Sequence, residues 1–235
     1  TKKGIMQTTG QIFGERLHTY TIVNAISDKN VLPFRYEYVG RVDIKENVKD
    51  EKVYKIDIEK AYDNKSRISA ITQYIIEHFS TKTKNDESYV YSTLENVVEV
   101  AKNRDAKQIK SKSNIKGFNS IFAVANISMA KKYYNEFKNN KNHNLKIALI
   151  YSYSANDEVA DGVYDENSET TEGLNKSDRD FLELAIKDYN KMFGTSYDTT
   201  GEKFQNYYKD ISLRMKNKEI DILIVANMFL TGFDA

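Results

Sequence analysis

Apolar runs alternate with amphipathic segments in the second half of the chain, and this order limits the folds that it can adopt. Apolar runs at residues 118–126, 145–153 and 221–226 predict strands, and the segments between them have helical periodicity. A strand–helix–strand order implies right-handed crossovers and parallel strands. The first run is apolar on both of its faces, which predicts a central strand covered by helices on each side. We therefore predict an α/β fold built on a parallel sheet.

The helices of this half follow from the spacing of large apolar residues. A helix after the first strand is predicted to turn Met129, Tyr133 and Phe137 inward. Between the second and third strands, Ser177 with Asp180 is predicted to cap a helix that runs to about Met192, and a second helix is predicted from about Glu202 to Lys216.

The first half of the chain carries weaker signals. Periodic apolar residues predict helices at residues 15–27 and 66–82, and alternation predicts a strand at residues 31–39. A serine followed three residues later by glutamate is a capping-box pattern, and it predicts the start of a helix over residues 92–110. Residues 154–175 are acidic and poor in large aliphatic side chains, so we expect a flexible loop there.

Composition excludes several kinds of site. The chain has no cysteine, which excludes disulfides, thiolate metal sites and cysteine nucleophiles. The charge is nearly balanced, with 35 basic and 34 acidic residues, so any contact to DNA must come from a local patch. The sequence shows no charged-then-apolar leader and no apolar stretch of membrane length. We therefore expect a cytoplasmic protein with no membrane partner.

Familiar catalytic and metal-binding motifs do not fit this sequence. The segment "GTSYDTTGEK" at residues 194–203 has the wrong glycine spacing for a phosphate-binding loop, and no Ser or Thr follows its lysine. The segment "DEVADG" at residues 157–162 lacks a ligand oxygen at the third position of a calcium loop. The 3 histidines are scattered, without the spacing of a metal site. We predict no catalytic and no metal-binding residue.

Polar residues follow all three strands predicted in the second half, at what would be the carboxyl edge of the sheet. They are Asn126, residues 152–156 and residues 227–234, and ligands of open α/β sheets gather at this edge. One interpretation of the closing "TGFDA" is a plain turn, in which Gly232 adopts a backbone conformation that would strain other residues and Asp234 caps a helix. The other is a loop whose small residues let a phosphate approach backbone N–H groups. The spacing alone leaves both interpretations open.

Four stretches of the sequence resemble one family. The closing "KEIDILIVANMFLTGFDA" resembles motif V of superfamily 2 helicases, in the form found in the motor, or R, subunit of type I restriction enzymes. Residues 8–34, "TTGQIFGERLHTYTIVNAISDKNVLPF", resemble the segment that joins the two motor lobes of that subunit. Residues 118–137, "FNSIFAVANISMAKKYYNEF", resemble motif IV and its helix, and residues 175–221 resemble the connection to motif V. The resemblance covers almost the whole chain.

This resemblance implies a fold and a parent enzyme. The fold would be a RecA-like (P-loop NTPase-type) three-layer parallel sheet that forms an incomplete second motor lobe. Residues 1–32 would be the linker and the end of the first lobe, and residues 33–235 the second lobe up to motif V. The intact subunit of this family is an ATP-dependent DNA translocase with an attached endonuclease, which uses ATP and Mg²⁺. Its implied partners are double-stranded DNA, the first motor lobe, and the methylation and specificity subunits.

The chain itself is expected to be only a piece of that motor. It carries no phosphate loop, no acidic Mg²⁺ box, no nuclease triad and no motif VI arginine. The groups that position the γ-phosphate and neutralise its charge would then come from elsewhere. We therefore expect neither ATP hydrolysis nor a tightly bound cofactor in the isolated chain.

Motif V positions carry the first set of implied roles. Thr231 and Gly232 match positions that contact phosphates of the tracked DNA strand. Gly232 and Asp234 match positions that face the nucleotide between the lobes.

Motif IV positions carry the second set of implied roles. Asn119, Asn126 and Ser128 fall where a polar tip could hold a DNA phosphate. Lys131 follows at the start of the next helix, where the N-terminal dipole adds to its charge. A solvated helix face is the alternative interpretation of this lysine.

Two other functions remain open at this point. One is a stand-alone α/β domain that binds a nucleotide, against which the missing phosphate loop counts. The other is a docking module that recruits a partner subunit through residues 154–175 or residues 41–66.

Overall fold

The computed structural model divides the chain into two compact units, Thr1–Asp43 and Ile44–Ala235, which are described separately. The residues that the structure describes are 14, 18–31, 33–39, 64–103, 105–152, 174–226 and 228. Nearly all of the predicted acidic loop at residues 154–175 lies outside the described residues, and so does most of the segment at residues 41–66.

One short helix, α2 (Ile22–Ser27), lies in the first unit. The Thr21 hydroxyl accepts a hydrogen bond from the Asn24 backbone N–H, and the Asn24 side chain accepts one from the Thr21 N–H. This reciprocal capping box fixes the start of the helix at Ile22. The helix predicted over residues 15–27 therefore begins later than expected, since residues 18–21 are not helical.

The strand predicted at residues 31–39 is not found in the described part of the first unit. Residues 33–39 have no regular secondary structure. Phe34, Tyr36 and Tyr38 are 65%, 74% and 91% exposed, so the apolar side of the alternation is not buried. The prediction is wrong because an alternating pattern makes a strand only where a second strand pairs with it.

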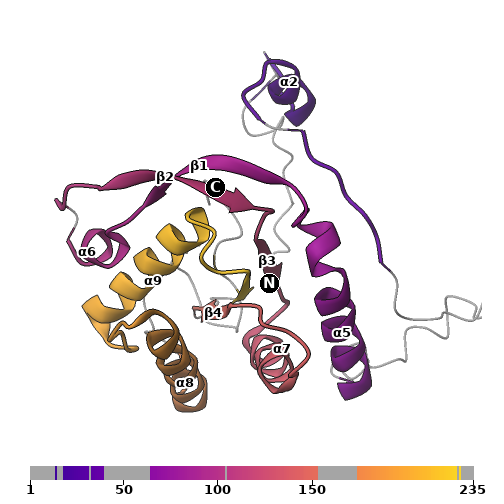
Figure 1. Cartoon of the computed structure of the whole chain (residues 1–235). Helices are drawn as coiled ribbons and strands as arrows, with labels where there is room; N and C mark the ends of the chain where they lie inside the picture. The colour runs from indigo at the N-terminus through magenta and orange to yellow at the C-terminus, as the bar shows by residue number, and fades with distance from the viewer. Residues whose placement is uncertain are drawn as a thin grey trace, which may run out of the picture. The chain divides into compact units, whose positions relative to one another are not determined.

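A three-stranded parallel sheet forms the centre of the second unit (Figure 1). Its strands are β3 (Ser120–Ala123), β4 (Ile147–Tyr151) and β5 (Ile222–Ala226), in the order β3-β5-β4. The middle strand β5 pairs in parallel with both neighbours. The three carboxyl ends therefore meet at one edge of the sheet.

The fully buried strand is β5, in which all 5 residues are 0% exposed. The edge strand β3 instead alternates between half-buried and exposed residues, and its Ile121 is 39% exposed. The prediction that the run at 118–126 is a central strand is wrong for the described sheet. A short apolar run suits an edge as well as a centre, and here the more aliphatic β5 takes the centre.

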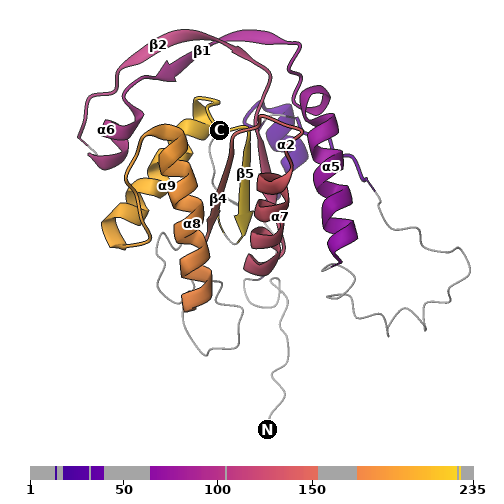
Figure 2. The ribbon, with the colours of Figure 1, turned by 60° about the horizontal axis from the view of Figure 1, so that its bottom comes forward.

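Helices cover both faces of this sheet, as Figures 1 and 2 show from two directions. One face carries α8 (Lys176–Phe193) and α9 (Gly201–Lys216), and the other carries α7 (Ile127–Asn139) with α5 (Lys65–Lys82) beyond it. The inward residues predicted for α7, namely Met129, Tyr133 and Phe137, are all buried. The ring of Phe122 in β3 meets the ring of Tyr133 edge to face, with centroids 4.8 Å apart. The predicted helix at residues 66–82 is confirmed as α5.

The start of α8 differs slightly from its prediction. Asn175, rather than Ser177, is the N-cap, and its Oδ1 accepts a hydrogen bond of 2.9 Å from the Asp178 N–H. Asparagine and serine are about equally favourable at the N-cap, so the residue types alone do not show which of the two begins the helix.

A β-hairpin with a short helix at its far end replaces the helix predicted over residues 92–110. Strand β1 (Ser88–Leu94) is followed by α6 (Val97–Lys102) and by strand β2 (Lys110–Lys116), which pairs with β1 in antiparallel fashion. The serine of the supposed capping box, Ser92, lies inside β1 and pairs with Lys112. The prediction is wrong because the tyrosines and β-branched residues of β1 favour a strand more strongly than the cap pattern favours a helix.

Buried polar contacts tie this hairpin to the rest of the unit. Asn217, which follows α9, accepts a hydrogen bond of 2.8 Å from the Leu94 N–H and donates one of 2.7 Å to the Leu94 carbonyl. At the other end, Gly117 has a φ of 58°. A Cβ on this glycine would lie 2.3 Å from the Asn85 side chain, so the turn from β2 towards β3 requires glycine.

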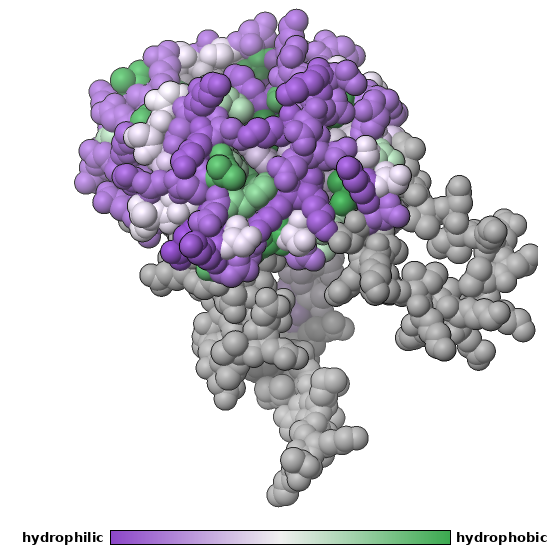
Figure 3. Space-filling model, turned by 90° about the horizontal axis from the view of Figure 1, so that it is seen from below, coloured by the Kyte–Doolittle hydropathy of each residue, from purple (hydrophilic) through white to green (hydrophobic). Residues whose placement is uncertain are grey.

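The surface of Figure 3 is mostly hydrophilic, with small separate apolar patches. Among the helices that the structure describes, none is both long and apolar enough to cross a membrane.

Replacement of Asn217 by alanine tests the anchor of the hairpin. The Asn217→Ala variant leaves the buried Leu94 N–H and carbonyl without their partner, so we expect a loss of roughly 2 to 4 kcal/mol in unfolding free energy. Urea denaturation measures this loss. Alanine at the exposed Asn144 is the control, and it should change the unfolding free energy by less than about 0.5 kcal/mol. Equal stability of the two variants would contradict the anchor.

Candidate nucleic-acid interface

Asn126 and Ser128 lie at the start of α7, at the carboxyl edge of the sheet. Asn126 is the N-cap, and its Oδ1 accepts a hydrogen bond of 2.9 Å from the Met129 N–H. Both Asn126 and Ser128 are exposed. The Asn126 amide nitrogen and the Ser128 hydroxyl have no partner among the described residues, so both can donate to a ligand.

The first turn of α7 contains no acidic residue. The first N–H groups of a helix carry a partial positive charge, which attracts anions unless a carboxylate lies next to them. In α8, by contrast, the acidic Asp178 occupies the first turn, and its backbone N–H donates the capping bond to Asn175. At this edge the start of α7 is therefore better suited to an anion than the start of α8.

Lys131 points from α7 towards α8. Its Nζ forms an ion pair with Asp178, and both side chains are 18% exposed. The same Nζ lies 5.6 Å from the centre of the Phe181 ring. The phosphate contact implied for Lys131 would require this pair to open, and the solvated helix face expected as the alternative is not what the structure shows. In this structure Lys131 ties α7 to α8.

Asn119 lies at the other edge of the sheet, just before the amino end of β3. Its Nδ2 donates a hydrogen bond of 2.6 Å to the carbonyl of Met215 at the end of α9. Asn119 and Asn126 therefore flank β3 at opposite ends, and the structure does not bring them together. Because the amide nitrogen of Asn119 already serves the protein, we assign no DNA contact to it.

The motif V positions Thr231, Gly232 and Asp234 lie outside the described residues. The strand that leads to them is β5, which runs to Ala226 and points to the same edge as the start of α7. The roles of these three residues stay predictions.

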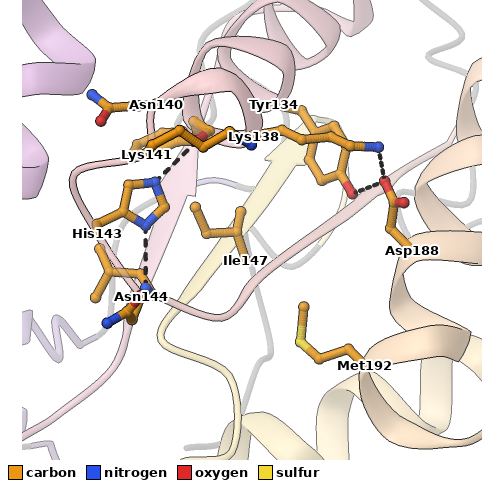
Figure 4. Close-up of a pocket in the computed structure, with 11 residues that line it drawn as sticks. Tyr134, Lys138, Asn140, Lys141, His143, Asn144, Ile147, Asp188 and Met192 are labelled. Atoms are coloured by element: carbon orange, nitrogen blue, oxygen red, sulfur yellow. Dashed lines mark hydrogen bonds and ion pairs between the residues drawn. The ribbon is translucent and has the colours of Figure 1, made fainter.

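A hollow of about 400 Å³ lies at the amino edge, and it was not predicted from the sequence. The end of α7, the start of β4 and the end of α8 line it (Figure 4). On its rim the Tyr134 hydroxyl donates a hydrogen bond of 3.0 Å to Asp188, which also pairs with Lys138. Burial, and then the charge of Asp188, raise the pKa of Tyr134. Most of the lining lies within residues 134–147, but Asp188 and Met192 come from α8, so no single stretch of sequence could have revealed the hollow.

The hollow contains a histidine with a fixed role. His143 Nε2 lies 3.0 Å from the Phe137 carbonyl, and its Nδ1 accepts a hydrogen bond of 3.1 Å from the Leu145 N–H. The neutral ring with its proton on Nε2 satisfies both contacts. The histidine thus joins the end of α7 to the start of β4, and we interpret the hollow as part of the scaffold.

Family comparisons match both parts of the chain. Residues 116–235 match the model of the family described as type I restriction enzyme subunit R domain 3. Residues 2–67 match the model of the SWI2/SNF2 ATPase.

Curated relatives point to the same family. The chain is 34% identical, over 97% of its length, to the type I restriction enzyme SauCOLORF180P endonuclease subunit of Staphylococcus aureus strain COL. It is 33% identical, again over 97% of its length, to the type I restriction enzyme SsaAORF53P endonuclease subunit of Staphylococcus saprophyticus. The chain spans only 21% of the length of each relative.

The class of protein is therefore an α/β domain with a parallel sheet, homologous to proteins with helicase- or ATPase-like domains. More specifically, the chain belongs to the family of type I restriction enzyme R subunits, in which its second half corresponds to domain 3. The resemblance of the sequence to this family is confirmed.

The cap of α7 gives a prediction about stability that is separate from DNA binding. Asn126→Ala removes the bond to the Met129 N–H and should lower the unfolding free energy by about 1 kcal/mol. Asn126→Ser keeps a capping oxygen and should be within about 0.5 kcal/mol of the unchanged chain. Urea denaturation separates the two outcomes, and an alanine variant as stable as the serine variant would show that the cap is not formed.

Proposed function

We propose that this chain is the second, RecA-like motor lobe of a type I restriction R subunit, and that the start of α7 holds a phosphate of the DNA strand that the motor tracks. The whole subunit would be an ATP-dependent DNA translocase and endonuclease. Its partners would be double-stranded DNA, its own first motor lobe, and the methylation and specificity subunits. This lobe would contribute DNA-backbone contacts and one wall of the ATP cleft.

One observation carries this proposal. A helix start with free N–H groups, no acidic residue in its first turn and two exposed donor side chains lies at the carboxyl edge of a parallel sheet. Ligands of such sheets bind at this edge. The arrangement lies within the region that matches the R-subunit family, so DNA phosphate is the anion that fits the family.

The chemistry of this site suits movement along any sequence. Backbone N–H groups, a serine hydroxyl and an asparagine amide recognise phosphate oxygens, and phosphate contacts carry no base information. A translocase needs contacts of this kind because it must step over every sequence that it meets. In this proposal Thr231 and Gly232 add phosphate contacts from the loop after β5. Gly232 and Asp234 also face the nucleotide.

ATP and Mg²⁺ belong to the proposal only for the intact subunit. Within the described residues, no group of three His, Asp or Glu side chains could hold a metal ion. The hollow of Figure 4 lies at the amino edge, away from the proposed cleft. The described residues therefore do not fit the cofactor by themselves, and we derive no step of ATP hydrolysis from them. The SWI2/SNF2 match of residues 2–67 is what supports an ATP-dependent motor.

A single charge placed at the start of α7 tests the proposal. In the full-length subunit, Ser128→Asp adds a carboxylate that the helix dipole tolerates but that repels a phosphate. We expect DNA affinity to fall about tenfold or more, the equivalent of about 1.4 kcal/mol, and DNA translocation to fall with it. Assembly with the methylation and specificity subunits should be unchanged.

The matched control is Asn142→Asp, which adds the same charge to an exposed turn at the opposite edge. It should bind DNA and translocate like the unchanged subunit. If Ser128→Asp also translocates normally, the start of α7 does not hold the tracked strand.

A further inference from the structure

The β1–β2 hairpin displays a row of lysines on its outer face. We call the two strands, Ser88–Leu94 and Lys110–Lys116, the ribbon. Strand β2 carries Lys110, Lys112 and Lys116, which are separated by two and by four residues. Because side chains alternate along a strand, all three leave the same face, and all three are exposed. The strand between the end of α6 and the start of β3 is thus basic along its length.

The residues of the ribbon around these lysines are uncharged. Neither strand of the ribbon contains Asp or Glu. Across the ribbon the three lysines stand opposite Leu94, Ser92 and Ser88, which are uncharged. None of the three lysines forms an ion pair within the part of the chain that the structure describes. Each of these charges is therefore available to an external anion.

The opposite face of the ribbon is fixed to the protein. Ile115, whose side chain leaves this face, is 9% exposed. Leu94, which is paired with Lys110 at the end of the ribbon, is also buried, at 7% exposed. The two bonds between Asn217 and Leu94 hold one end of the ribbon, and the Phe118 N–H donates a hydrogen bond of 2.7 Å to the Thr83 carbonyl at the other end. The lysine row is consequently displayed on a rigid support, which reduces the entropy that a partner must overcome on binding.

The geometry of the row fits a nucleic-acid backbone. From Lys110 to Lys116 the strand rises about 20 Å, which equals about six base pairs of duplex at 3.4 Å each. The major groove of B-DNA is wide enough to admit a two-stranded ribbon. Protein interfaces, by contrast, are depleted of lysine at their centres. A phosphate backbone is therefore a better partner for this face than a protein surface.

We propose that the ribbon is a second DNA-binding surface, on which Lys110, Lys112 and Lys116 contact backbone phosphates. This surface is distinct from the start of α7. The ribbon leads through Gly117 and Phe118 into the amino end of β3, whereas α7 begins after the carboxyl end of β3 (Figures 1 and 2). The choice of DNA as partner rests on the proposed function. The site itself rests on the charge pattern and the anchoring of the ribbon.

Salt dependence of DNA binding tests this proposal. In the full-length subunit, the three lysines are changed together to glutamine (K110Q, K112Q, K116Q). Binding of a mixed-sequence duplex is followed by fluorescence anisotropy at several salt concentrations. Each lost phosphate contact should flatten the plot of log affinity against log salt by about 0.9. We expect the slope to become less steep by nearly three, with weaker binding at low salt.

Two control variants separate charge from other effects. K65Q, K187Q and K191Q together remove three exposed lysines from α5 and α8, and their slope should match that of the unchanged subunit. Changing the ribbon lysines to arginine keeps the charge and should keep the slope. If the arginine variant loses as much affinity as the glutamine variant, charge is not what is recognised, and the proposal is wrong.

The remaining outcomes are also decisive. If the unchanged subunit binds DNA and the glutamine variant binds with the same slope, the ribbon is not a DNA-binding surface, while the proposed function stands. If the unchanged subunit does not bind duplex DNA, the proposed function itself fails, and the ribbon proposal fails with it. If the glutamine variant binds DNA normally but no longer assembles with the other subunits, the ribbon binds an acidic protein surface instead.

Discussion

Complete burial of the central strand β5 is the constraint on which the second unit depends. Its backbone pairs with a parallel strand on each side, and helices cover both of its faces, so all 5 residues are removed from water. Burial on this scale needs an aliphatic strand and fixes the register and direction of its neighbours. Because all three strands point the same way, the ends of β3, β4 and β5 meet at one edge. The start of α7 lies at that edge, where we propose that it holds a ligand.

Charged residues of the helices are divided between holding the fold and facing outward. Lys131 and Lys138 of α7 are paired with Asp178 and Asp188 of α8, which joins the two helices across the β4 edge of the sheet. The first turn of α7, at the same time, carries no acid that would oppose an anion. The lysines of the ribbon differ from Lys131 and Lys138, because they have no acidic partner in either strand. These two surfaces are therefore the ones that we propose as contacts to DNA.

Long periodic helices were predictable, while features set by distant contacts were not. The spacing of Met129, Tyr133 and Phe137 was enough to identify α7 and its buried face. The ribbon was missed because only Ile115 of β2 is buried, so the strand carries almost no apolar alternation. The sequence also predicted that Asn126 lies at the carboxyl edge of the sheet, where the structure places it. It could not show that Lys131 pairs with Asp178 or that Asn119 bonds to Met215, because these partners are distant in the chain.

Photochemical cross-linking tests the central claim most directly. A photoreactive amino acid would replace Ser128 in the full-length subunit, and a second preparation would carry it at Asn142, on the opposite edge of the sheet. Both would be irradiated with duplex DNA. Contact between DNA and the start of α7 predicts a cross-link from position 128 and little or none from position 142. Equal cross-linking from both positions, or cross-linking from position 142 alone, would contradict a DNA-binding carboxyl edge.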